Sequence, residues 1–210
     1  MKRILAVFMK YPQPGQVKTR MIPRIGEAGA AAAYCELLTA TLQSLPQTGY
    51  DIWIAYTPKD RQLGVAAWLC ENVPGFRWSR LVPQDGADLG TRLWNVVHTA
   101  LEVEKAASVT LIGTDCPRIR SEHFAEAQDL LENGCEVVFG PAHDGGYYLQ
   151  ALTSAKRELF FGIPWSSSKT LAACLERVRF LGLKAGQLEA LGDVDTADDW
   201  QRWQKEMKNR

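Results

Sequence analysis

The amino-acid sequence predicts an α/β fold with a largely parallel sheet, formed by one domain over residues 1–210. The first observation is that short β-prone runs alternate with longer helical runs, as in strand–helix–strand units. The second is length, because 210 residues can bury a substantial core without being divided. The third is continuity, since neither an internal repeat nor a low-complexity linker interrupts the chain.

The predicted elements follow one another in a regular order. The β-prone runs predict strands at residues 3–9, 51–56, 77–82, 108–113 and 136–140. Longer runs of helix-forming residues predict helices at residues 27–45, 61–71, 89–106, 121–133, 167–180 and 196–208. Residues 147–152 alternate weakly after a Gly-Gly turn and predict an added strand, whereas 153–166 are irregular and 183–191 fit one further short strand.

Composition excludes several classes of function. The 24 basic residues balance the 24 acidic ones, so no bulk charge is available to hold nucleic acid or an anionic membrane. No apolar stretch approaches the roughly 18 to 20 residues that a membrane span needs, and the run after Met1-Lys2-Arg3 lacks the cleavage site of a signal peptide. The five cysteines are scattered and contain no CxxC pair. This pattern predicts reduced thiols in a cytoplasmic protein and argues against a zinc site.

A basic loop follows the first predicted strand. The segment MKYPQPGQVKTRMIP, residues 9–23, contains Lys10, Lys18 and Arg20 but no acid. It is not a Walker A loop, because Val17 stands where that loop needs glycine before its lysine. Arginine and lysine together suit a diphosphate, so the loop is interpreted as a phosphate site. The alternative is a solvated loop that pairs with acids elsewhere.

A lone carboxylate, Asp115, follows the predicted strand 108–113 in the motif VTLIGTDCP. Ligands of open α/β sheets bind at the carboxyl ends of strands, so Asp115 is well placed to hold a hard cation such as Mg²⁺. The alternative is that Asp115 only makes an Asx-type turn before Pro117. The residues alone leave both interpretations open.

The loop GPAHDGGYYL, residues 140–149, has the composition of a loop that binds a small polar substrate. Glycines allow close approach of the backbone, a carboxylate takes hydroxyl protons, and aromatic rings stack on a sugar or base. The predicted substrate-binding residues are His143, Gly145, Gly146 and Tyr147, and Asp144 is the predicted base. The alternative is a hairpin turn, which Asp-Gly strongly favours.

The motif GDVDTADDW, residues 192–200, precedes the last predicted helix. Asp195 or Thr196 is expected to cap that helix. Capping leaves Asp193 unexplained, and Asp195 is able to cap and coordinate together.

Taken together and in order, these motifs resemble the bacterial DUF2064 family of GT-A-type transferases. The resemblance covers the chain from Met1 to about Trp200 and rests on KxPxPGxVKTR, PQ…DLG, GTDCP, DGGYYL and DVDTxDD. It implies the Rossmann-like α/β/α sandwich, with a mostly parallel sheet, that nucleotide-sugar glycosyltransferases share with sugar nucleotidyltransferases.

The resemblance also implies roles for single residues. Asp115 matches a metal-binding aspartate after the fourth strand, and Asp195 matches a second ligand near the C-terminus, so Mg²⁺ or Mn²⁺ is the implied cofactor. Gln84, Gly90 and Thr91 match a stretch that contacts the base in sugar-phosphate nucleotidyltransferases.

The sequence also differs from the related families at three places. The glycine-rich LAAGxGxRMG loop is replaced by residues 8–15, and a literal DxD is absent at Asp115. His143 stands where an acid is expected before Asp144.

We therefore expect a Mg²⁺-dependent transferase that uses a nucleotide-sugar donor and a small-molecule acceptor. Lys10 would help to bind the nucleotide, Lys18 and Arg20 would neutralise the leaving phosphate, and Asp144 would deprotonate the acceptor. The second hypothesis is a nucleotidyltransferase that joins an NTP to a phosphorylated small molecule. The third is a nucleotide-binding module without catalysis, which would not need all of these charged residues.

Overall fold

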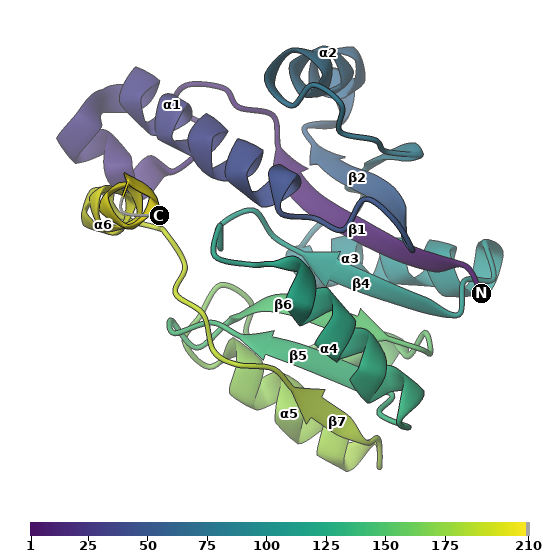
Figure 1. Ribbon diagram of the computed structural model, residues 1–210. Helices are drawn as coiled ribbons and strands as arrows, with labels where there is room; N and C mark the ends of the chain where they lie inside the picture. Colours follow the sequence, from purple (N-terminus) through teal and green to yellow (C-terminus); the bar gives the residue numbers. More distant parts are fainter. Residues whose placement is uncertain (209–210) are drawn as a thin grey trace.

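The centre of the fold is a seven-stranded sheet in the computed structural model, which describes residues 1–208 (Figure 1). Its spatial order is β3-β2-β1-β4-β6-β5-β7, and all neighbours are parallel except β6, which runs antiparallel to β4 and β5. The strands are β1 (Arg3–Lys10), β2 (Asp51–Thr57), β3 (Arg80–Pro83), β4 (Ser108–Ile112), β5 (Val137–Pro141), β6 (Tyr147–Leu152) and β7 (Ala185–Gln187). The mostly parallel sheet is therefore confirmed.

Helices cover both faces of this sheet (Figure 1). One face packs against α1 (Ile22–Gln43), α2 (Gln62–Asn72) and α4 (Ser121–Glu132). The other packs against α3 (Leu89–His98), the π-helical turn Thr99–Val103 and α5 (Thr170–Phe180). Short 3₁₀ turns occur at Thr19–Met21, Lys59–Arg61 and Arg157–Leu159. The fold is the expected α/β/α sandwich.

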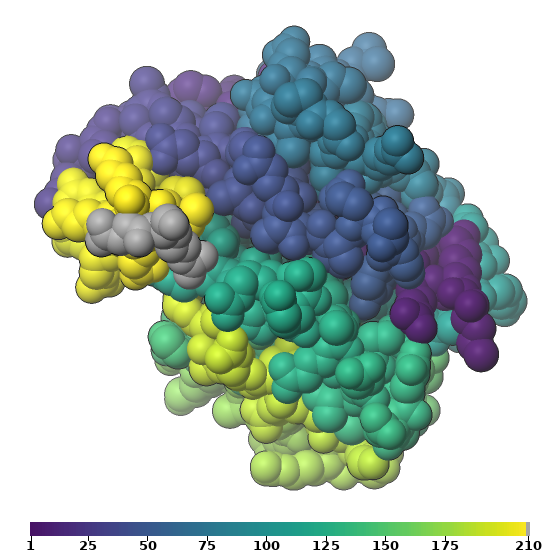
Figure 2. Space-filling view, in the orientation of Figure 1, coloured from purple at the N-terminus to yellow at the C-terminus, as the bar shows by residue number. Residues whose placement is uncertain are grey.

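The last helix, α6 (Ala197–Lys208), packs against α1 rather than on the sheet. Its Trp203 is buried beside Leu37 of α1, together with Val194 of the preceding linker. Figure 2 shows α6 (yellow) lying against the first helix at one end of the molecule. The linker between β7 and α6 carries Asp193 and Asp195, and its Val194 N–H donates a 2.8 Å hydrogen bond to the Asp115 carbonyl.

Element boundaries depart from prediction where pairing or packing decides them. The predicted strand 77–82 begins only at Arg80, because β2 pairs with it from Trp53↔Arg80 onward. The predicted helix 27–45 starts earlier, at Ile22, and is broken at Gly26 (φ 71°, ψ 169°). The stretch 183–191 contributes only three residues, β7, to the edge of the sheet.

The position of β1 determines where a ligand can bind. Residues Ile4–Val7 are fully buried, which explains the continuous apolar run of a strand that is covered on both faces. From β1 the chain proceeds to β2 and β3 on one side, and β4 lies on the other. A topological switch point therefore lies between β1 and β4, and their carboxyl ends carry Lys10 and the Thr114-Asp115 loop. No helix within residues 1–208 is long and apolar enough to cross a bilayer.

Candidate active site

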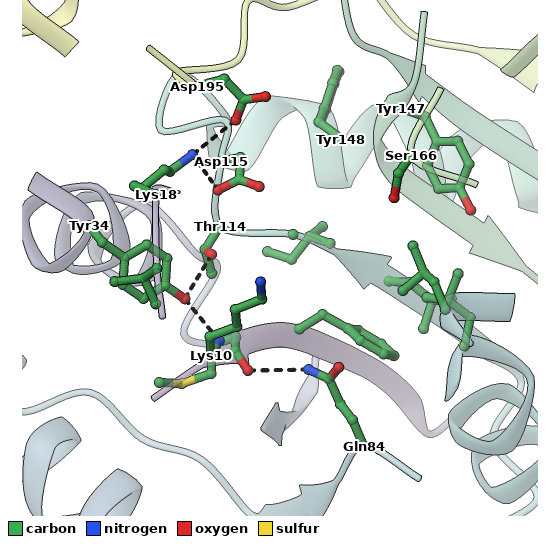
Figure 3. A pocket seen from close by; sticks show the side chains of 18 of the residues that line it. Lys10, Lys18, Tyr34, Gln84, Thr114, Asp115, Tyr147, Tyr148, Ser166 and Asp195 are labelled. Carbon is green, nitrogen blue, oxygen red and sulfur yellow. Dashed lines mark hydrogen bonds and ion pairs between the residues drawn. The ribbon is translucent and has the colours of Figure 1, made fainter. Parts of the chain in front are cut away.

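A cleft of about 470 Å³ lies at this switch point, and we call it the main cleft (Figure 3). Apolar side chains such as Phe8, Leu93 and Leu111 form part of its wall. The polar and charged residues around it come from both halves of the sheet: Lys10, Lys18, Thr19, Arg20, Tyr34, Gln84, Thr114, Asp115, Tyr147, Tyr148, Ser166 and Asp195. A cavity that combines an apolar wall with convergent polar groups is typical of a site for an organic ligand.

Lys18 connects the basic loop with both predicted metal ligands. Its Nζ lies 2.6 Å from Asp115 Oδ1 and 3.2 Å from Asp195 Oδ1 (Figure 3). It also donates a hydrogen bond of 2.5 Å to the carbonyl of Val194. Because the Lys18 side chain is only 5 % exposed, its ammonium group is enclosed by these three oxygens. Both carboxylates thus contact one cation, the Lys18 ammonium. The basic loop also pairs with acids from elsewhere in the chain, which is the alternative interpretation given for it from the sequence.

The other two basic residues of the loop keep donors free. Arg20 is 72 % exposed and uses Nη1 for a 2.9 Å contact with Asp195 Oδ2. The Lys10 side chain is exposed at the rim of the main cleft, and no hydrogen bond or ion pair joins its ammonium to another residue in the described part of the chain. Both are therefore available to an anion that enters the cleft.

Tyr34 of α1 holds the two strand ends together. Its hydroxyl accepts a 2.9 Å hydrogen bond from the Lys10 backbone N–H and lies 3.2 Å from Thr114 Oγ1 (Figure 3). The side chain is buried, and burial raises the pKa of its hydroxyl, so Tyr34 stays neutral. No sequence motif indicated this residue, because it sits in the middle of an apolar helix face.

A second cavity of about 150 Å³ adjoins the main cleft, and we call it the acidic cavity. Four carboxylates line it: Asp115, Asp144, Asp193 and Asp195. Burial and then the neighbouring charge of Asp144 raise the pKa of the Asp193 carboxyl. The structure thus places Lys18 on the main cleft, Asp144 on the acidic cavity, and Asp115 and Asp195 on both hollows. It also adds Asp193 to the site. The only indication of Asp193 in the sequence was that capping of the last helix left this acid unexplained.

The loop that carries Asp144 is both a turn and a cavity wall. Asp144 Oδ1 accepts a 2.8 Å hydrogen bond from the Gly146 N–H, which is the turn geometry that the alternative interpretation expected. Asp144 and Gly146 also line the acidic cavity. Gly145 (φ 90°) packs against the loop before α5, since a Cβ on it would lie 2.1 Å from the Ser168 carbonyl oxygen. Its role in the structure is therefore close packing.

The three residues predicted to contact the base, Gln84, Gly90 and Thr91, do not all line the main cleft. Gln84 lines the main cleft, where its side-chain amide donates to the backbone carbonyls of Met9 (3.2 Å) and Ala55 (2.9 Å). Its Oε1 has no hydrogen-bond partner among residues 1–208. Gly90 and Thr91 lie outside the cleft lining. Thr91 N–H donates to the side chain of Asp88, which caps α3, and a Cβ on Gly90 would lie 2.2 Å from the Phe160 carbonyl oxygen.

The remaining predicted substrate-binding residues, Tyr147 and His143, line different hollows. Tyr147 lines both hollows, and its hydroxyl donates to Gln150 Oε1 at 3.1 Å. His143 instead lines another surface hollow, which it shares with Arg118 and Asp193. Cys116, beside Asp115, is buried, and burial raises the pKa of its thiol to about 12, so a thiolate nucleophile is absent at neutral pH.

The donor set at Asp115 and Asp195 fits a divalent metal ion. Within residues 1–208 there is no group of three or more His, Cys, Asp or Glu side chains arranged as a cage for a metal. Mg²⁺, however, is usually held by one or two carboxylates together with substrate phosphates and water. Asp115 and Asp195 supply two carboxylates that already converge on one cation, the ammonium of Lys18.

Comparison with known proteins gives a family and a fold. The model of the family described as "Uncharacterized protein conserved in bacteria (DUF2064)" matches residues 41–167. A protein of Desulfovibrio desulfuricans G20, described as a candidate nucleotide-diphospho-sugar transferase, is 32 % identical, with a TM-score of 0.88 over 100 % of this chain and 89 % of its own. No curated protein matches the sequence.

Two more distant structures share the fold. The CMP:2-keto-3-deoxy-manno-octonic acid synthetase complexed with CTP is 13 % identical, with a TM-score of 0.60 over 100 % of this chain and 99 % of its own. The glucosyl-3-phosphoglycerate synthase of Mycobacterium tuberculosis, in complex with Mn²⁺, UDP and glucosyl-3-phosphoglycerate, is also 13 % identical. Its TM-score is 0.52 over 90 % of this chain and 70 % of its own. The fold is thus one that nucleotidyl- and glycosyltransferases share.

Proposed function

We propose that this chain, a transferase-like protein that belongs to the DUF2064 family, moves a sugar from a nucleotide-diphosphate donor to a hydroxyl group of a small acceptor. The nucleotide would occupy the main cleft, and the acceptor would occupy the acidic cavity beside it. Residues on both walls, Asp115 and Asp195 above all, would then lie where the two substrates meet.

The chemistry of the acidic cavity is the observation that carries this proposal. Four carboxylates line the cavity, and no lysine, arginine or histidine is among its lining residues within the described chain. Carboxylates only accept hydrogen bonds, so they suit the hydroxyl groups of an acceptor. They would repel a phosphorylated acceptor, which a nucleotidyltransferase needs as its nucleophile. This contrast favours glycosyl transfer over the second hypothesis.

The donor side of the site offers the opposite chemistry. Arg20 and Lys10 would bind the diphosphate. Their exposure at the rim of the main cleft supports this role, because their free donors are accessible there. A planar guanidinium can hold two phosphate oxygens at once, and an ammonium adds a point charge. Gln84 Oε1, which has no partner in the part of the chain that the structure describes, would accept a hydrogen bond from an N–H group of the base.

A divalent metal ion, Mg²⁺ or Mn²⁺, would be held by Asp115 and Asp195. When bound, such an ion neutralises charge that develops on the departing diphosphate. The Mn²⁺ complex of the distant glucosyl-3-phosphoglycerate synthase supports this choice of metal as an analogy of fold.

Asp144 would serve as the general base for the acceptor. Its Oδ1 is engaged by the Gly146 N–H, and Oδ2 stays available to a hydroxyl in the acidic cavity. In the reaction, the bond between the anomeric carbon and the diphosphate oxygen breaks. The acceptor oxygen bonds to that carbon, and its proton passes to Asp144.

A product assay tests the proposal. The protein is incubated with UDP- and GDP-sugars and a panel of polyols, with Mg²⁺ or Mn²⁺, and the release of nucleoside diphosphate is measured. A parallel set contains NTPs and sugar phosphates, and pyrophosphate is measured. We expect nucleoside diphosphate only. Pyrophosphate release would instead establish nucleotidyl transfer, and neither product, despite nucleotide binding, would indicate a binding module.

Two variants connect the assay with the site. Asp115→Asn should abolish the metal-dependent part of the thermal stabilisation that a bound nucleoside diphosphate gives. Asp198→Asn is the matched control. It makes the same change on α6, at a surface residue paired with Arg24, and it should behave as wild type. Equal behaviour of the two variants would contradict a metal role for Asp115.

A further inference from the structure

Lys18 occupies the position between the two acids that a metal ion would need. Three oxygens surround its nitrogen: Asp115 Oδ1 at 2.6 Å, Val194 O at 2.5 Å and Asp195 Oδ1 at 3.2 Å. An ammonium group has three N–H donors, so the number of protein acceptors equals the number of donors. Lys18 therefore has no donor left for a phosphate oxygen in this arrangement.

The backbone at Lys18 also departs from the ordinary. Its φ and ψ are both 45°, which is the left-handed region that non-glycine residues seldom adopt. The Lys18 side chain is 5 % exposed, and its ammonium is directed to Asp115 and Asp195 on the wall of the main cleft. The neighbouring Arg20, which is 72 % exposed, lacks this enclosure.

The two cations cannot occupy the same position. Mg²⁺ requires ligand oxygens at about 2.0–2.1 Å and near-octahedral geometry. An ammonium 2.6 Å from Asp115 Oδ1 lies within the space that such an ion and its other ligands would fill. Repulsion between a divalent ion and a lysine ammonium at this separation adds to the conflict.

We propose that Lys18 and a divalent metal ion compete for Asp115 and Asp195, so that binding of the metal releases Lys18 into the main cleft. Lys18 is then an internal counter-ion in the free protein and gains free donors for the donor diphosphate when the metal arrives. The inference rests on the proposed function only for the identity of that anion, since the exchange itself involves the protein and the metal alone.

The first test measures Mn²⁺ affinity of the free protein by electron paramagnetic resonance. Lys18→Met removes the competitor and should bind Mn²⁺ about tenfold or more tightly than wild type, because charge-assisted contacts to both acids no longer oppose the ion. Arg20→Met is the matched control, since it removes one positive charge that also contacts Asp195. It should change the affinity by no more than about twofold, as expected for an exposed pair.

The second test follows Lys18 in the wild-type protein, which avoids any folding defect of a variant. The protein is treated briefly with the N-hydroxysuccinimide ester of acetic acid, with and without saturating Mn²⁺, and acetylation is read by mass spectrometry. Lys18 should be protected without the metal and reactive with it, whereas the exposed Lys10 should react in both samples.

Several results would overturn the inference. One is that Lys18 stays protected from acetylation at saturating Mn²⁺. Another is that Lys18→Met and Arg20→Met raise the Mn²⁺ affinity equally. The third is that neither the wild type nor Lys18→Met binds Mn²⁺. None of these measurements uses a sugar donor or turnover. A failure of sugar transfer alone would therefore contradict the proposed function and leave the exchange standing.

Discussion

The packing of Gly145 allows a stability prediction to be worked out from distances. This glycine has a φ of 90°, and an added Cβ would lie 2.1 Å from the carbonyl oxygen and 2.7 Å from the carbonyl carbon of Ser168. Both are backbone atoms, so the contact cannot be relieved by rotating a side chain. The Gly145 carbonyl also accepts a 3.0 Å hydrogen bond from the Leu171 N–H at the start of α5. Gly145→Ala must therefore move the whole loop.

The size of the effect follows from two contributions. Placing alanine at positive φ costs about 1–2 kcal/mol. Separating the loop from α5 sacrifices the hydrogen bond to Leu171, which is worth about 1 kcal/mol. The sum, about 2–3 kcal/mol, corresponds to a fall in melting temperature of roughly 4–12 °C for a chain of this size.

Gly182→Ala is the matched control, since Gly182 has a φ of 66° but an added Cβ there meets nothing within 4 Å. We expect only the conformational cost, about 1–2 kcal/mol, and a correspondingly smaller fall in melting temperature. Thermal unfolding of the two variants, followed by circular dichroism, decides the matter. If Gly145→Ala melts no lower than Gly182→Ala, the packing argument is refuted.

Two further predictions concern the acidic cavity. Asp144→Asn keeps the turn but cannot accept a proton, so turnover should fall by about 10²- to 10⁴-fold with donor affinity nearly unchanged, and wild-type kinetics would remove Asp144 from the catalytic residues. Asp193→Asn should raise the melting temperature at pH 7, because the fold raises the pKa of Asp193 and so disfavours its ionised form. This gain should disappear below the unfolded pKa of about 3.9, where both states are protonated, and a gain that persists at pH 3 would contradict the electrostatic cause.

The buried strands and the position of the charged loops that follow them were predictable because they depend on local patterns. The apolar run before Lys10 and the β-prone run before Asp115 each predict a buried strand that ends in a polar loop. Parallel strands place such loops at one edge of the sheet, so the basic loop and Asp115 were expected at the same edge. Edge elements were less predictable, because the short β7 depends on its pairing with β5.

The roles of individual glycines and acids required the tertiary structure. Gly90 and Gly145 are surrounded by residues from distant segments, Phe160 and Ser168, which no local pattern can indicate. The same holds for Tyr34, whose hydroxyl joins two strand ends from a helix face that reads as ordinary core.

The sequence by itself determined the α/β class, the charged motifs and their order, because periodicity, turn residues and charge are local properties. Only the tertiary structure decided how these charges are paired. It placed Lys18 between Asp115 and Asp195, left Lys10 and Arg20 with free donors, and gathered four carboxylates around one cavity. The physical reason is that a pairing depends on distances of a few ångströms between side chains far apart in the chain, and packing alone sets those distances.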